Sequence, residues 1–212
     1  MDRYKELIKN MPVDEQSFTT KKTTWQRFID QNISSEILCE IFGDKDEIEL
    51  SRADLFNIAR GCNINKLIIS TILWGYPRGM RGNHFENISS KLEEIKECLL
   101  EAKSGIENWN NHYEKLSEIN GIGLSTYTKL LYFYGAKVGG LPCVILDQRI
   151  IDSVNKSAVS GLEALEGIAP YNASGKYPEY LDIIDKAAKK YTTTNGRVEM
   201  FIFSFGLNIK VR

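Results

Sequence analysis

The feature that most constrains this chain is a pair of glycines between two helical patterns. Gly121 and Gly123 follow a segment with apolar residues at Leu116 and Ile119. Apolar residues recur at helical spacing again from 127 to 134. Because glycine tolerates positive φ and a close backbone neighbour, the sequence predicts a tight turn that reverses the chain between two helices.

Such a turn has a binding property of its own. The backbone N–H groups at the start of the second helix lack partners within that helix, and together with the helix dipole they favour an anion. A DNA phosphate is an obvious candidate, whereas the plain alternative is a structural corner between two helices. The candidate DNA-binding residues are Asn120, Gly121, Gly123, Ser125, Thr126 and Lys129.

An aspartate follows the second helix after the apolar run Val144-Ile145-Leu146. The glycine turn, the apolar helix and Asp147 together resemble the helix-hairpin-helix DNA glycosylase superfamily, which includes the 8-oxoguanine and adenine glycosylases. The stretch 197–206 is similar to the helix that closes these domains, and the resemblance covers roughly Leu55 to Asn208. The hairpin matches at Ile119, Gly121, Ile122 and Gly123, and the aspartate matches at Asp147.

The resemblance implies a catalytic role for Asp147. An enzyme that excises a base must first flip it out of the stack. Breaking the glycosidic bond creates positive charge on the sugar, which a nearby carboxylate stabilises. Asp147 also suits an N-cap for a helix that begins at Gln148, and both roles can hold at once.

The hairpin also bears on the route of base removal. In the 8-oxoguanine enzymes a lysine two residues after the second hairpin glycine forms a Schiff base, and this chain has Ser125 there. The sequence Gly-Ile-Gly-Leu-Ser-Thr instead resembles the monofunctional adenine glycosylases. Lys129 lies one helical turn later, where it could approach a phosphate. The resemblance therefore implies removal of a base by water, and strand-cleaving lyase activity is not expected.

A loop rich in glycine and arginine follows the most apolar helical segment. Trp74, Tyr76 and Arg78 lie at its start, and we expect them to line a base pocket, where aromatic rings stack on a base and arginine meets phosphate. The alternative is a flexible surface connection. The glutamine-rich signature that the glycosylases carry near this point is missing.

The predicted fold class is all-α, a multi-helix glycosylase-like fold with one helix-hairpin-helix motif. Residues 1–50 are expected to form an N-terminal helical segment packed on the core, and residues 51–212 the glycosylase-like domain. Ser17 to Thr24 is expected to be a polar connection, and no strand is predicted. Ser51 followed by Asp54 predicts a capped helix start, and Asn65 is a candidate cap for the next helix.

Composition restricts the possible partners. The net charge is −1, so contact with DNA must come from a local patch rather than a global positive field. No membrane span is expected. The four cysteines are scattered, with none after Cys143, so we expect reduced thiols in a cytoplasmic protein, no metal site, no iron–sulfur cluster and no cofactor.

Three functions remain open on the sequence. The first is a monofunctional DNA glycosylase with Asp147 as its catalytic carboxylate. The second is a catalytically inactive glycosylase-fold protein that binds nucleic acid or a modified nucleobase, with an operon-encoded protein partner in bacterial antiviral defence. The third is a helical protein-interaction module whose hairpin is only structural. The resemblance does not identify the base.

Overall fold

Helices account for most of the chain, as the apolar periodicity predicts. The computed structural model describes residues 1–156, 159 and 161–209. The helices are α1 (Lys5–Lys9), α2 (Lys22–Asp30), α3 (Ser35–Phe42), α4 (Arg52–Arg60), α5 (Ile64–Gly75), α6 (His84–Ser90), α7 (Leu92–Ala102), α8 (Trp109–Ser117), α9 (Leu124–Tyr134), α10 (Gln148–Lys156), α11 (Ala173–Tyr191) and α12 (Asn195–Phe205).

Two small antiparallel hairpins correct the expectation of an all-α chain. In the first, β1 (Ser17–Lys21) pairs with β2 (Glu47–Ser51), so the expected polar connection after residue 17 is a strand. In the second, β3 (Lys137–Val138) pairs with β4 (Leu141–Pro142) in the segment between α9 and Asp147. The first hairpin forms because Phe18 faces Leu50 and Thr20 faces Ile48 across the pair, which gives the strands one face turned toward the protein.

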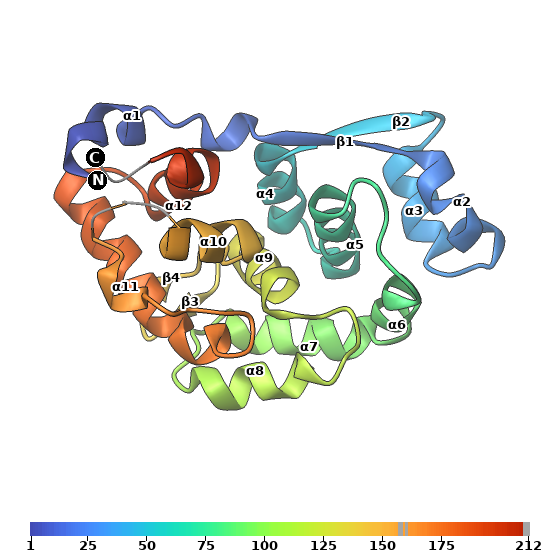
Figure 1. Ribbon diagram of the computed structural model, residues 1–212. Helices are drawn as coiled ribbons and strands as arrows, with labels where there is room; N and C mark the ends of the chain where they lie inside the picture. The colour runs from blue at the N-terminus through green and yellow to red at the C-terminus, as the bar shows by residue number, and fades with distance from the viewer. Residues whose placement is uncertain (157–158, 160, 210–212) are drawn as a thin grey trace.

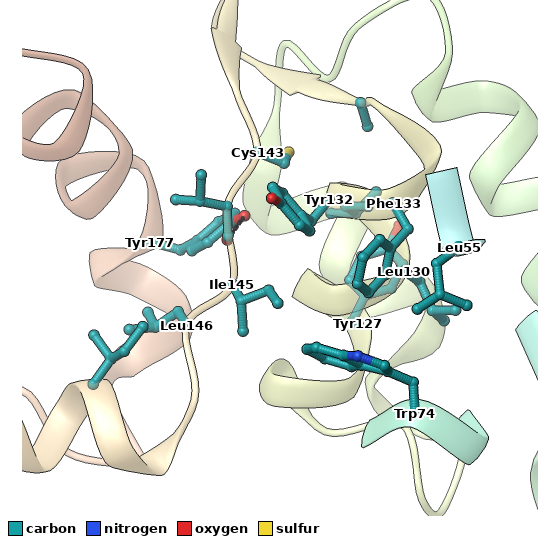
Figure 2. Close-up of a cluster of buried hydrophobic side chains, with 14 of the residues drawn as sticks. Leu55, Trp74, Tyr127, Leu130, Tyr132, Phe133, Cys143, Ile145, Leu146 and Tyr177 are labelled. Carbon is teal, nitrogen blue, oxygen red and sulfur yellow. Dashed lines mark hydrogen bonds between the residues drawn. The ribbon is translucent and has the colours of Figure 1, made fainter. Parts of the chain in front are cut away.

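Helix α9 lies at the centre of the fold. Its residues 126–133 are all buried, and it packs beside α5, α4 and α7. Figure 2 shows Tyr127, Leu130 and Phe133 of α9 among side chains from several other elements. Such an all-round buried helix holds its neighbours at fixed positions, so the turn at the start of α9 is rigidly attached to the core.

The N-terminal segment spans one edge of the molecule. Figure 1 shows α1 beside α11 and α12, whereas the long β1–β2 ribbon leads away to α2 and α3 near α5. The chain then enters α4 directly from β2. The segment 13–21 therefore contacts α12 as well as α4 and α5.

The N-terminal caps of α4 and α5 can be compared with the caps predicted from the sequence. The capping box at Ser51 and Asp54 is confirmed, because each side chain accepts a hydrogen bond from the other's backbone N–H. The cap of α5 is Asn63, whose side chain accepts from the N–H of Lys66, so the prediction of Asn65 was wrong by two residues. In the described part of the chain, no helix combines the length and apolar character needed to cross a membrane.

Candidate active site

A cavity of about 220 Å³ lies where α4, α5, α9, α10 and α12 meet the segment that enters β1. Its walls combine aromatic rings with charged side chains, which is typical of a ligand pocket with a few polar groups. The aromatic residues are Phe18, Trp74, Tyr76 and Phe203, and the charged ones are Arg52, Lys129, Asp147, Arg149 and Glu199.

Asp147 lies in the cavity wall and also begins α10. Its Oδ1 accepts a hydrogen bond of 3.1 Å from the N–H of Ile150, so the predicted N-cap is present. The apolar run before it is buried and anchored by side-chain hydroxyls. Tyr177 donates to the carbonyl of Val144 (2.8 Å), Tyr180 donates to that of Ile145 (2.9 Å), and Thr128 Oγ1 accepts from the N–H of Leu146 (3.1 Å).

Lys129 lines the same cavity from α9. Its side chain runs back one helical turn, and its Nζ donates to Ser125 Oγ (2.6 Å) and to the Ser125 carbonyl (3.1 Å). Burial lowers the pKa of the Lys129 amine, whereas the carboxylates of Asp147 and Glu199 oppose that shift. The amine is therefore held in a site that disfavours its charged form.

A buried ion pair forms the floor of the cavity. Arg52 of α4 and Glu199 of α12 are 1% and 0% exposed, and the shorter of their two contacts is 2.7 Å. Arg52 also donates to Gln16 Oε1 (2.7 Å) and to the hydroxyl of Tyr132 (3.1 Å). Burial alone would lower the pKa of Arg52, but attraction to Glu199 and its hydrogen bonds raise that pKa. Burial raises the pKa of Glu199, and attraction to Arg52 opposes that shift.

A second, more open groove of about 720 Å³ follows the glycine turn between α8 and α9. Gly121 has φ of +101° and lies against His84, where an added Cβ would come within 2.9 Å of the His84 Cβ. Thr126 accepts or donates a 2.7 Å hydrogen bond with the hydroxyl of Tyr76, which lines both the groove and the cavity. Tyr76 therefore lies between the two spaces.

The structure groups most of the residues singled out in the sequence. Trp74, Tyr76 and Asp147 line the cavity, and Ser125 lines both spaces. Lys129 is buried in the cavity wall instead of lying on the outer surface of the hairpin. Arg78 is exposed and is part of neither lining. The groove is lined by Asn120, Gly121, Gly123 and Thr126.

Sequence reasoning missed the residues that come from distant segments. Gln16 and Phe18 reach the cavity from the segment around β1, and Arg52 and Glu199 pair across 147 positions. The lone carboxylate of Glu199 in an otherwise apolar helix was a usable signal, because a buried carboxylate needs a partner. Within the described residues, no group of three or more His, Cys, Asp or Glu side chains could hold a metal ion.

Comparison with protein families gives one result that spans nearly the whole chain. The model of the family described as "Putative 8-oxoguanine DNA glycosylase OGG-like protein" matches residues 11–203. The comparisons with curated proteins and with solved structures gave no match. The matched region includes the glycine turn and every residue named above as lining the cavity. The chain therefore belongs to the family of 8-oxoguanine DNA glycosylase OGG-like proteins.

Proposed function

We propose that the protein removes a damaged or modified base from DNA and that the cavity is the excision site. The observation that carries this proposal is the presence of Asp147 and Lys129 in one cavity walled by four aromatic residues. The cavity of about 220 Å³ is several times larger than the space that one water molecule needs, about 30 Å³, so it has room for a group larger than water. Membership of a DNA glycosylase family supports DNA as the substrate.

Base removal needs a pocket that accepts a flipped nucleotide. Aromatic rings offer stacking surfaces that replace the neighbouring bases of the duplex. The rings of Trp74 and Phe18 are 5.2 Å apart in an edge-to-face arrangement, which makes one wall rigid. We therefore propose that Phe18, Trp74, Tyr76 and Phe203 enclose the extruded base.

The carboxylate of Asp147 has the role of stabilising charge on the sugar. As the glycosidic bond breaks, positive charge develops at C1′, and a fixed carboxylate lowers the energy of that state. The cap bond to Ile150 uses Oδ1 of Asp147, and within the described chain Oδ2 has no hydrogen-bond partner. The cap thus orients the side chain and leaves Oδ2 for the substrate.

The groove along the glycine turn is the proposed DNA-binding surface. No side chain caps the start of α9, so its first backbone N–H groups have no partner within the helix, and Gly123, Ser125 and Thr126 line the groove. Arg81 lines the same groove and supplies a local positive charge on a chain of net charge −1. We propose that the turn acts as a helix-hairpin-helix that holds a phosphate beside the cavity.

The decisive test compares Asp147→Asn with Asp152→Asn. Asparagine is also a good N-cap, so the first variant keeps the start of α10. Asp152 lies in the same helix outside the cavity lining and serves as the matched control. Duplexes carrying 8-oxoguanine, adenine opposite 8-oxoguanine, uracil, alkylated purines or deazaguanines are incubated with each protein, and abasic sites are scored by alkali. Asp147→Asn is expected to lower the excision rate by about 10²–10³-fold.

The outcomes separate the two leading functions. Excision by wild type and Asp152→Asn, with loss in Asp147→Asn, supports the glycosylase. If no duplex yields abasic sites while the wild-type protein binds DNA measurably, the excision proposal fails. The non-excising reading, a protein that binds nucleic acid or a modified base, then takes its place.

A further inference from the structure

The side chain of Tyr76 lies between the cavity and the groove, and its hydroxyl is held at a fixed point. Tyr76 directly follows α5 and lines both spaces. Its hydroxyl lies 2.7 Å from Thr126 Oγ1, and Thr126 Oγ1 donates to the carbonyl of Gly121 at 3.2 Å. Because that second bond uses the only hydroxyl proton of Thr126, the Tyr76 hydroxyl is the donor in the first. The tip of the ring is therefore attached to α9 and to the glycine turn.

The backbone around Tyr76 is also held. The N–H of Gly79 donates to the carbonyl of Tyr76 at 2.8 Å, which closes a turn. Thr20 Oγ1 of β1 donates to the carbonyl of Pro77 at 2.8 Å and accepts from the indole N–H of Trp25 at 2.9 Å. Tyr76 is thus an aromatic ring fixed at both ends, with open space on either side of it.

The groove beside Tyr76 offers further surfaces that suit a planar ring. Its lining includes Tyr113 of α8 and Met80, both half-buried, and the buried side chain of Ile119. The ring of Tyr113 stacks on the buried ring of Trp109, with centroids 5.4 Å apart and 20° between the planes. The core therefore fixes the orientation of Tyr113. Fixed aromatic rings beside open space are surfaces on which nucleobases stack.

The charges of the groove are too few for a surface that grips a duplex by its backbone. Among the described residues that line the groove, Arg81 is the only arginine or lysine, and there is no carboxylate. Proteins that bind duplex DNA through its phosphates use several such cations. Stacking of bases on aromatic rings supplies affinity without them. The groove therefore suits one base and its phosphate better than a stretch of duplex.

We propose that the groove binds the base next to the target in the same strand, with Tyr76 between the two bases. This inference rests on the proposed function, which assigns the target base to the cavity. The groove, at about 720 Å³, is larger than the cavity of about 220 Å³, so it has room for a second base. Both nucleotides must then be unpaired, which costs free energy in a duplex and little in a single strand or loop. Unpaired DNA is thus the preferred class of substrate.

The test measures the affinity of the wild-type protein for a set of labelled DNA strands by fluorescence anisotropy at one salt concentration. The target is whichever base the protein excises, or 8-oxoguanine if none is found. Its sugar carries a 2′-fluorine, which disfavours positive charge at C1′ and keeps the strand intact. In three further strands, a tetrahydrofuran spacer replaces the base on the 5′ side of the target, on the 3′ side, or several nucleotides away. The last strand is the matched control, and a fully paired duplex completes the set.

One of the two adjacent spacers is expected to weaken binding by about 5–150-fold, which is the effect of losing one stacked base. The distant spacer is expected to change nothing. The paired duplex is expected to bind at least about tenfold more weakly than the single strand, because two bases must leave the stack. Two adjacent spacers without effect would overturn the inference, and so would a duplex that binds as tightly as the single strand.

A pair of protein variants locates the contact. Tyr113→Leu keeps an apolar side chain against Trp109 but removes the ring face. Tyr171→Leu removes a ring that is 86% exposed and lies outside the groove lining, and it is the matched control. The effect of the adjacent spacer is expected to shrink at least about twofold in Tyr113→Leu and to stay unchanged in Tyr171→Leu. If circular dichroism shows that Tyr113→Leu is unfolded, the strands measured with wild type still decide.

Excision is scored separately on strands without the fluorine, which keeps this inference distinct from the proposed function. Excision combined with binding that ignores both adjacent spacers would overturn the groove as a base site and leave the excision site standing. A loss of affinity with one adjacent spacer, without excision of any base, would support the groove and overturn excision. No binding to any strand or to the duplex would overturn both.

Discussion

Two buried cations line the same cavity, and their surroundings differ. Arg52 has a carboxylate partner, a tyrosine hydroxyl and a glutamine oxygen, all within 3.3 Å. Lys129 has only the two neutral oxygens of Ser125. Arg52 thus has a carboxylate in direct contact, whereas Lys129 forms no ion pair within the described residues, and Asp147 and Glu199 attract its charge without touching it.

The difference helps to distinguish buried groups that belong to the scaffold from those that are candidates for a role in the reaction. A buried charge whose partners are all present is part of the scaffold, and removing it leaves the partner exposed to the apolar interior. A buried amine that forms no ion pair has no such structural partner, so its retention points to reactivity. The ion pair at the floor of the cavity is therefore part of the scaffold, and the wall carries the proposed chemistry.

The largest expected effect on stability comes from breaking the ion pair between Arg52 and Glu199. Arg52→Met leaves Glu199 buried without its partner and is expected to lower the free energy of unfolding by about 3–5 kcal/mol. Lys129→Met leaves no buried charge behind, so its effect is expected to stay within about 1.5 kcal/mol in either direction. Urea denaturation of both variants measures the contrast.

A double variant tests whether the loss of stability in Arg52→Met comes from the unpaired carboxylate of Glu199. Arg52→Met combined with Glu199→Met replaces the ion pair with apolar side chains, and much of the lost stability is expected to return. Equal losses in Arg52→Met and Lys129→Met would contradict the distinction between a matched and an unmatched cation.

The two glycines of the turn also differ in whether the fold requires them, and the expected effects on stability are smaller. Gly121 has positive φ and lies against His84, so the fold itself explains it. Gly123 has φ of −79°, and an added Cβ there would meet nothing within 4 Å. Gly121→Ala is expected to cost about 1–3 kcal/mol in unfolding free energy, and Gly123→Ala about 0.5 kcal/mol or less.

DNA affinity is expected to separate the two glycines in a second way. If a phosphate approaches the open side of the turn, the methyl group of Gly123→Ala weakens binding of an abasic duplex while the protein stays folded. Fluorescence anisotropy at one fixed salt concentration measures this affinity. Binding equal to wild type by a folded Gly123→Ala would count against a phosphate at this position.

Local signals in the sequence were sufficient for part of this fold. The capping box at Ser51 and Asp54 needs only four residues, and the structure has it where it was predicted. The pairing of β1 with β2 was not predicted because polar and apolar residues alternate over only five positions in Glu47–Ser51, which is a weak signal for a strand. In addition, the partner strand lies about 30 positions earlier in the chain.

In the candidate site, too, some residues could be predicted from local sequence and others could not. Asp147 follows an apolar run directly in the chain, so its place beside the cavity could be anticipated, although its catalytic role stays a prediction. The floor could not be anticipated in the same way, since Arg52, Glu199 and Gln16 come from three distant segments. Only tertiary packing shows that Lys129 turns inward, because a single lysine on a helix is ordinarily solvated.

The pH dependence of stability gives the smallest and most specific contrast. Burial lowers the pKa of Lys129 from 10.5, whereas Asp147 and Glu199 oppose the shift. Between the folded pKa and 10.5 the unfolded chain binds more protons, so this group makes the unfolding free energy rise with pH. Below the folded pKa both states are protonated, and the full cost of burying the charge remains.

Lys129→Met removes that cost, so the variant is expected to gain most over wild type at low pH. The gain is expected to shrink as pH rises through the window that ends near 10.5. Urea denaturation at a series of pH values, with the variant and wild type measured together, isolates this difference from the titration of other groups. Lys137→Met, which removes an exposed lysine of β3, is measured beside it as the control. A gain that grows with pH would mean that the Lys129 amine is stabilised in its charged form, as Arg52 is, and would contradict the contrast between the two groups.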